Sequence, residues 1–110
     1  MTDARVVFTT VAEAAEAEKI SRALVERRLA ACVNILPHIR SIYRWQGKVE
    51  EAAEILLLIK TTAAQFPAVR DAIRELHSYA VPECISLPID AGSPDYLKWL
   101  AENVQPPPQS

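Results

Sequence analysis

Residues 29–60 read LAACVNILPHIRSIYRWQGKVEEAAEILLLIK, two long apolar arms around a single turn at Gln46-Gly47. Gly47 supplies the positive φ that a tight hairpin needs, and neither proline nor glycine interrupts the returning arm. At ~3.4 Å per residue, arms of about 14 residues reach roughly 45–50 Å. A compact chain of this length has a diameter of only roughly 35 Å. We therefore expect the hairpin to overhang its own domain.

The length and composition fit one globular domain without nucleic-acid or membrane partners. The chain has 110 residues, half of them apolar, and a net charge of −2. Its basic residues form no block, and its longest apolar run, residues 55–59, is too short to span a bilayer. The N-terminus lacks a signal-peptide pattern. Two cysteines, Cys32 and Cys84, are typical of small core residues in a reduced cytoplasmic protein.

The periodicity of apolar residues predicts alternating strands and helices. Pro37, inside the first hairpin arm, cannot donate a ladder hydrogen bond and predicts a bulge. The order indicates an α+β ferredoxin-like split β-α-β sandwich, with both main helices on one face of an antiparallel sheet. The expected elements are a strand at 6–10, a helix at 13–28, hairpin arms at 30–45 and 49–61, a helix at 63–77, a strand at 83–89 and a short helix after Ser93 with Tyr96, Leu97 and Leu100 as its apolar stripe. This single domain covers residues 1–104, and the proline-rich tail 105–110 is expected to be disordered.

The second face of this sheet carries too many apolar side chains to meet water. Residues 55–59 place apolar side chains on both faces of one strand. Because helices cover only one face, we expect other copies of the chain to cover the other. On this view, Leu57→Asp places an unpaired charge in an interface and disrupts the assembly.

Two segments carry candidate functional side chains. At the hairpin tip, Trp45 lies opposite Lys48, which can rest on an aromatic ring, although such residues also stabilise a solvated turn. After the second helix, His77, Tyr79 and Glu83 gather an imidazole, a phenol and a carboxylate, which bind metals or transfer protons. The alternative is that all three residues are structural. In that case the histidine interacts with the dipole at a helix C-terminus, the turn is capped, and the glutamate starts a strand.

A further charged pair lies on the returning arm of the hairpin. Glu54 and Lys60 share a strand face with Leu56 and Leu58. Because buried charges need partners, this pair indicates the rim of an interface or a polar pocket. With only two glycines and no nucleophile-elbow serine, the sequence offers no phosphate loop, dinucleotide site or hydrolase motif, so we expect no enzyme.

Five segments together resemble the CutA divalent-cation tolerance family. They are RLAACVN (28–34), YRWQGKVE (43–50), IKTT (59–62), HSYAVPE (77–83) and DYLKWL (95–100). The resemblance runs from Val6 to Asn103. It implies a ferredoxin-like homotrimer assembled through its hairpins, cytoplasmic, associated with tolerance to copper and other divalent cations, and without an established catalytic activity.

The resemblance also implies a site. His77 and Glu83 would be the metal ligands for Cu²⁺ or another divalent cation, beside an inter-subunit pocket formed by Trp45, Lys48, Glu54, Lys60 and Tyr79. Copper-binding members have a cysteine and a second histidine where this chain has Thr9 and Leu76. Because copper prefers thiolate and imidazole, we expect weak copper binding. Two alternatives remain, a trimeric anion sensor resembling the PII signalling proteins and a scaffold without ligand.

Overall fold

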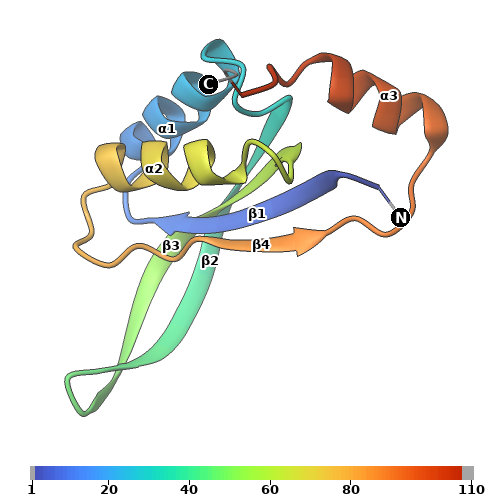
Figure 1. The fold of residues 1–110 in the computed structure, drawn as a ribbon. Helices are drawn as coiled ribbons and strands as arrows, with labels where there is room; N and C mark the ends of the chain where they lie inside the picture. Colours follow the sequence, from blue (N-terminus) through green and yellow to red (C-terminus); the bar gives the residue numbers. More distant parts are fainter. Residues whose placement is uncertain (1, 108–110) are drawn as a thin grey trace.

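The computed structural model describes residues 2–107 and contains four strands and three helices in the predicted order (Figure 1). The element order confirms the α+β prediction. The elements are β1 (Ala4–Val11), α1 (Ala14–Glu26), β2 (Cys32–Trp45), β3 (Lys48–Thr62), α2 (Phe66–Leu76), β4 (Ile85–Pro88) and α3 (Pro94–Glu102).

The strands form one antiparallel sheet in the order β2-β3-β1-β4, with α1 and α2 on the same face (Figure 1). This is the predicted ferredoxin-like arrangement, and β4 with Pro88 lies at an edge as expected. The core lies between the helices and this face of the sheet. Its fully buried side chains include Val7 and Val11 of β1, Leu57 and Ile59 of β3, Ile20 and Leu24 of α1, and Ile73 of α2.

The β2–β3 hairpin extends well beyond the rest of the sheet, as predicted (Figure 1). Its turn residues Gln46 and Gly47 have φ of 51° and 80°, a pair of positive values that matches the twist of the flanking strands. Trp45 pairs with Lys48, as the sequence predicts. The longest dimension of the molecule is 43 Å, shorter than the reach expected of a straight ribbon, because strands twist.

A bulge interrupts the β2–β3 ladder at the predicted place. The register shifts between Leu36 and Ile39, and His38 inside the shift has a φ of 65°. The extra residue changes which side chains of β2 face the helices, so Ile39 lies opposite Glu54 on the face away from them.

The expectation for Leu57→Asp is wrong, because Leu57 faces the helices. Leu57 is fully buried in the core, so an aspartate there disrupts the single chain rather than an interface. The residues that face away from the helices are its neighbours Leu56 and Leu58. On that face Phe8 of β1 lies between Leu58 and Ile85, and the side chain of Ile85 is half exposed.

The C-terminal elements differ in detail from the prediction. In α3, Leu100 is buried, but Tyr96 is exposed and does not belong to the apolar stripe. Gln105, the first residue of the predicted tail, is held by two hydrogen bonds. Its N–H donates to the Arg28 carbonyl at 2.8 Å, and its carbonyl accepts from the Gln65 side chain. Residues 108–110 of the predicted disordered tail lie outside the described residues.

Within residues 2–107, none of the helices combines the length and the apolar composition that crossing a membrane requires.

Candidate functional site

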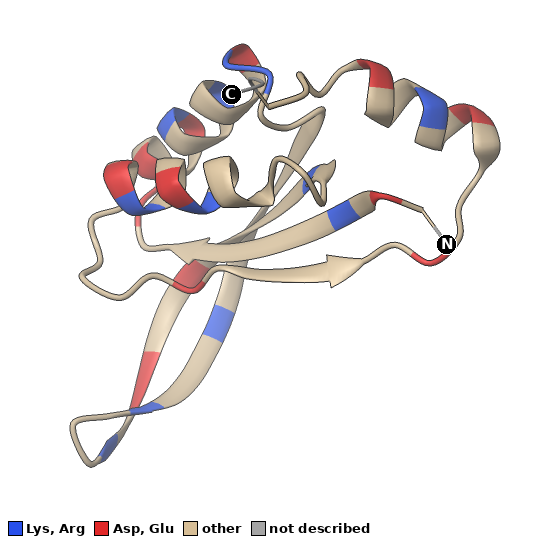
Figure 2. Cartoon of the chain, viewed as in Figure 1, with Lys and Arg blue, Asp and Glu red and all other residues tan. Residues whose placement is uncertain are grey.

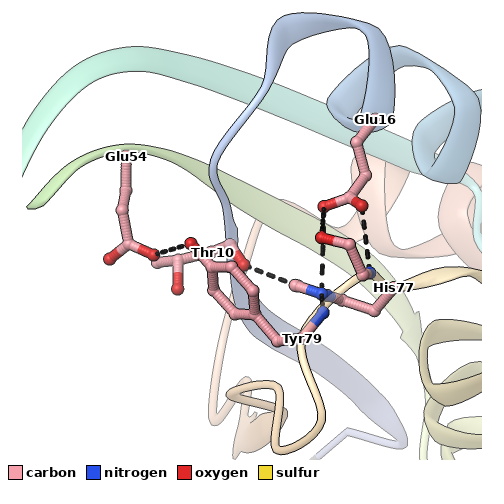
Figure 3. A network of polar contacts seen from close by, with 6 residues as sticks. Thr10, Glu16, Glu54, His77 and Tyr79 are labelled. Carbon is pink, nitrogen blue, oxygen red and sulfur yellow. Dashed lines mark hydrogen bonds and ion pairs between the residues drawn. The ribbon is translucent and has the colours of Figure 1, made fainter. Parts of the chain in front are cut away.

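His77 ends α2 and fastens the following loop to β1. Its ring Nε2 lies 2.7 Å from the Thr10 carbonyl oxygen, and its Nδ1 lies 3.0 Å from the Tyr79 backbone nitrogen (Figure 3). A carbonyl only accepts and a backbone N–H only donates, so the ring is the neutral tautomer that carries its proton on Nε2. Both ring nitrogens of His77 are therefore used inside the chain.

Glu16 of α1 holds the same loop from the other side. Its Oε2 accepts the Ser78 backbone N–H at 3.0 Å, and its Oε1 accepts the Ser78 hydroxyl at 3.2 Å (Figure 3). The Oε1 atom also lies 3.8 Å from His77 Nδ1, but in this tautomer Nδ1 carries no proton, so the pair is not an ion pair. Two elements, β1 and α1, thus fix the loop after α2.

The fixed loop presents Tyr79 to Glu54 of β3. The Tyr79 hydroxyl donates to Glu54 Oε2 at 2.8 Å, and the Tyr79 ring leans on the His77 ring at a centroid distance of 4.6 Å (Figure 3). Glu54 is only 9% exposed. Burial, followed by the hydrogen bond and charge of Glu54, raises the pKa of Tyr79 to about 12, so the phenol keeps its proton and remains a donor.

Glu83 adds a second carboxylate nearby. It lies in the loop before β4, not at the strand start that the sequence predicts. Much of the residue is exposed, yet partial burial of its carboxyl group, together with the charge of Glu54, raises the pKa of Glu83. Within residues 2–107, no three His, Cys, Asp or Glu side chains converge as a metal centre. The arrangement is a polar network with a concentration of negative charge.

The other predicted site residues lie apart from this network within one chain. Lys60 donates to the Asn34 side chain of β2, and it is six residues along β3 from Glu54. Trp45 and Lys48 close the exposed hairpin tip, which projects away from the sheet (Figures 1 and 2). The structure therefore brings together His77, Tyr79, Glu54 and Glu83, but not Lys60, Trp45 or Lys48.

Thr9 and Leu76, the positions at which the resemblance implies copper ligands in other members, have apolar surroundings. Thr9 is fully buried on the helix-facing side of β1, and its hydroxyl has no partner among the described residues. Leu76 packs against the core. Neither residue offers the thiolate or imidazole that copper prefers.

Sequence reasoning missed two members of the network. Glu16 lies in the first turn of α1, where an acidic residue is already expected because it interacts with the helix dipole. Thr10 contributes only its backbone carbonyl, which no residue type signals.

Comparison with known proteins identifies one family along nearly the whole chain. Residues 5–103 match the family model described as CutA1 divalent ion tolerance protein. A Thermus thermophilus relative named "Divalent-cation tolerance protein CutA" is 54% identical over 98 residues, covering 89% of this chain and 95% of the relative. Human "Protein CutA" is 47% identical over 95 residues, covering 86% of this chain but 53% of the human protein. This chain spans little more than half the length of its matched animal relatives.

Solved structures agree with the sequence matches. The divalent cation tolerance protein from Thermus thermophilus superposes with a TM-score of 0.91 at 52% identity, covering 93% of this chain and 99% of that one. CutA from Xylella fastidiosa gives a TM-score of 0.92 at 44% identity, covering 94% and 100%. Names of other relatives refer to chloroplastic and periplasmic proteins, so they cover more than one compartment. The predicted resemblance is confirmed.

Proposed function

The chain belongs to the CutA1 divalent ion tolerance protein family, and from that premise we propose that it serves divalent-cation homeostasis by binding such ions weakly between the copies of a homotrimer. The observation that carries the proposal is the pair of Glu54 and Glu83. The charge of Glu54 raises the pKa of Glu83, and neither carboxylate has an ion-pair partner among the described residues. A cation between them offsets that repulsion.

His77 and Glu83 are the proposed ligands, with Glu54 behind them. The lone pair of His77 Nδ1 is engaged by the Tyr79 N–H at 3.0 Å, so a metal ion competes with that hydrogen bond. Glu54 Oε2 is engaged by the Tyr79 hydroxyl, whereas its Oε1 has no hydrogen bond among the described residues. The proposed site has no thiolate, and its one imidazole already accepts a hydrogen bond. Such a site binds copper weakly and accepts other divalent cations.

The homotrimer is supported by apolar surface that the single chain leaves uncovered. The hairpin beyond the sheet exposes Ile42 and Val49 on one face and Tyr43 and Trp45 on the other. The sheet face away from the helices exposes Ile85 and Leu87. An overhang that is apolar on both faces is stable only when other chains cover it.

The assembly also explains why the site residues lie apart within one chain. Because the tip with Trp45 and Lys48 projects beyond its own domain, it can meet the polar network around Tyr79 only on a neighbouring copy. We therefore assign these two residues, with Lys60, Glu54 and Tyr79, to a pocket between copies. In such a pocket, Lys48 provides a positive charge that makes cation binding weaker still, or that holds an anion beside the metal.

A binding role fits the network better than catalysis. The raised pKa of Tyr79 keeps the phenol protonated, so Tyr79 is a hydrogen-bond donor rather than a nucleophile at neutral pH. The proposed compartment is the cytoplasm, where the free cysteines Cys32 and Cys84 remain reduced.

Calorimetry with Cu(II) tests the metal role on tag-free protein. The unmodified chain is expected to bind weakly. Both His77→Gln and Glu83→Gln are expected to reduce the affinity about tenfold or more, since even the loss of a group that supports a metal ligand costs about 10–100-fold. His38→Gln, which removes the only other histidine at the hairpin bulge, is the matched control. Binding that His77→Gln and Glu83→Gln leave unchanged, in variants with native circular dichroism, would refute the assignment.

A further inference from the structure

We propose that a hollow between α2 and the segment 80–84 binds small organic monoanions, with Arg70 and Arg74 holding the carboxylate and apolar side chains holding the body of the ligand. The hollow has a volume of about 270 Å³. This lies just below the ≈ 300–1,000 Å³ of typical ligand pockets, so the space suits a ligand smaller than a drug-sized molecule. It is lined by Arg70, Ile73, Arg74, Ala80, Val81, Pro82 and Cys84.

The charge of the hollow comes from two arginines one helical turn apart. Arg70 and Arg74 lie four residues apart on α2, a spacing at which like charges repel each other. The helix dipole stabilises the positive charge of Arg74 in the last turn, but it has little effect on the charge of Arg70 in the middle of the helix. Arg70 Nε contacts Asp71 at 3.2 Å, whereas Arg74 has no ion pair among the described residues. An anion between the two guanidinium groups relieves their repulsion.

Cys84 shows that this positive charge extends into the hollow. Burial raises the pKa of the Cys84 thiol, while the charges of Arg70 and Arg74 act to lower it. The charge of Glu83 opposes the arginines at the same thiol. With Asp71 and Glu83 both close by, the hollow favours a ligand with a single negative charge over a dianion such as a phosphate ester.

The remaining walls suit an apolar ligand body. Ala80, Val81 and Pro82 line the hollow, and the Val81 side chain is 75% exposed in the single chain, a large fraction for an apolar residue. Val81 precedes Pro82 and is therefore restricted to extended conformations, which keeps the wall preformed. A carboxylate joined to a ring or a branched chain satisfies the guanidinium groups and covers Val81 at the same time.

This anion site is distinct from the proposed cation site and does not rest on it. The cation site is made of the His77 imidazole and the Glu83 and Glu54 carboxylates, whereas the anion site is made of guanidinium groups and binds carboxylates. The two share the loop that runs from Tyr79 to Glu83. The anion site gives a physical basis for a response to small molecules in this chain.

Titration with benzoate, followed by amide chemical shifts in NMR, tests the site on the full chain. Benzoate has the charge and about the size that the hollow suits, and benzamide is an uncharged probe of the same shape. We expect benzoate at fixed ionic strength to shift the Ala80, Val81 and Cys84 amides saturably, with a dissociation constant on the order of a few millimolar. We expect benzamide to shift them at least tenfold less at the same concentration.

Matched variants assign the effect to the two arginines. Arg70→Gln and Arg74→Gln are each expected to weaken benzoate binding about tenfold. Arg22→Gln, which removes an exposed arginine paired with Glu18 on α1, leaves it unchanged. Equal shifts with benzamide, no saturable shift at all, or benzoate binding retained in the Arg70→Gln/Arg74→Gln double variant would overturn the proposal. The cation site is tested separately, since the Arg74→Gln variant keeps its Cu(II) response if that site exists.

Discussion

Tyr79 links two parts of the molecule that lie 25 residues apart in sequence. Its hydroxyl donates to a Glu54 carboxylate that is almost completely buried. A buried carboxylate that loses a donor keeps its desolvation cost without compensation, so the hydrogen bond matters more for Glu54 than for Tyr79. The same reasoning gives His77 a structural role even in the absence of metal, because its ring places the Tyr79 backbone.

Tyr79→Phe is therefore expected to lower the free energy of unfolding by about 1–3 kcal/mol, because it removes the donor to Glu54 and leaves the rest of the ring in place. Urea denaturation at neutral pH measures the change. Tyr96→Phe is the control, since Tyr96 is exposed on α3, away from the hairpin. Equal stability of the two variants would show that the Tyr79–Glu54 bond contributes nothing.

The raised pKa of Tyr79 predicts how this contribution depends on pH. Tyrosine ionises near pH 10 in the unfolded chain and near 12 in the native one, so the native state holds the proton more tightly. The stabilisation is complete below pH 10 and is lost as the pH rises through 12. The difference in unfolding free energy between the unmodified chain and Tyr79→Phe should be constant from neutral pH to about 10 and then decline. A constant difference throughout would contradict the assignment.

At the residue scale, the sequence predicts which side chains matter better than it predicts their contacts. His77, Tyr79 and Glu83 stand out because three chemistry-bearing groups share one irregular loop. The bond from Tyr79 to Glu54 depends on how the loop after α2 crosses the sheet, and residue spacing does not contain that information. Glu16 could not be distinguished from an ordinary first-turn acid.

At the element scale, the backbone conformation of the hairpin turn restricts which residue types fit there. Gly47 has a φ of 80°, and a methyl group added there would meet no atom within 4 Å. The cost of Gly47→Ala is thus conformational alone, about 1–2 kcal/mol. Gln46 has a φ of 51°, where asparagine is better tolerated, so Gln46→Asn should stabilise the chain by roughly a few tenths of a kcal/mol. Thermal unfolding of both variants measures these opposite shifts, and a shift of the same sign in both would contradict this description of the turn.

The order of the elements was predictable because each element has its own spacing of apolar residues and is marked by residues such as proline or glycine. Phe66, Val69 and Ile73 recur at helical spacing, and Pro37 marks the bulge in β2. The bounds were less predictable. The fourth strand begins at Ile85 rather than Glu83, because pairing with β1 ends at Phe8 and leaves Glu83 in the loop. Ladder pairing is a property of two strands, so one strand's sequence does not fix its end.

At the scale of the whole molecule, the fold is complete on one face of the sheet and incomplete elsewhere. Both long helices lie on one face (Figure 1). The opposite face and the hairpin beyond the sheet carry exposed apolar side chains. The sequence predicted this excess of apolar surface but not which residues bear it, since the assignment of Leu57 required the register of β3 against β1. In β3, the residues of even number, such as Leu56 and Leu58, face away from the helices.

The proposed homotrimer is best tested at Val49, on the hairpin. Val49 is 66% exposed in the single chain and lies opposite Arg44. In Val49→Asp the new carboxylate meets that arginine across the ladder, so the single chain tolerates it, whereas an apolar interface does not. Sedimentation of the unmodified protein should give about three times 12.2 kDa, and Val49→Asp should shift the population towards single chains. Val25→Asp, at an exposed valine of α1 away from the hairpin, should keep the assembled mass. A folded Val49→Asp protein whose mass equals that of Val25→Asp would show that the hairpin is not the surface through which the copies associate.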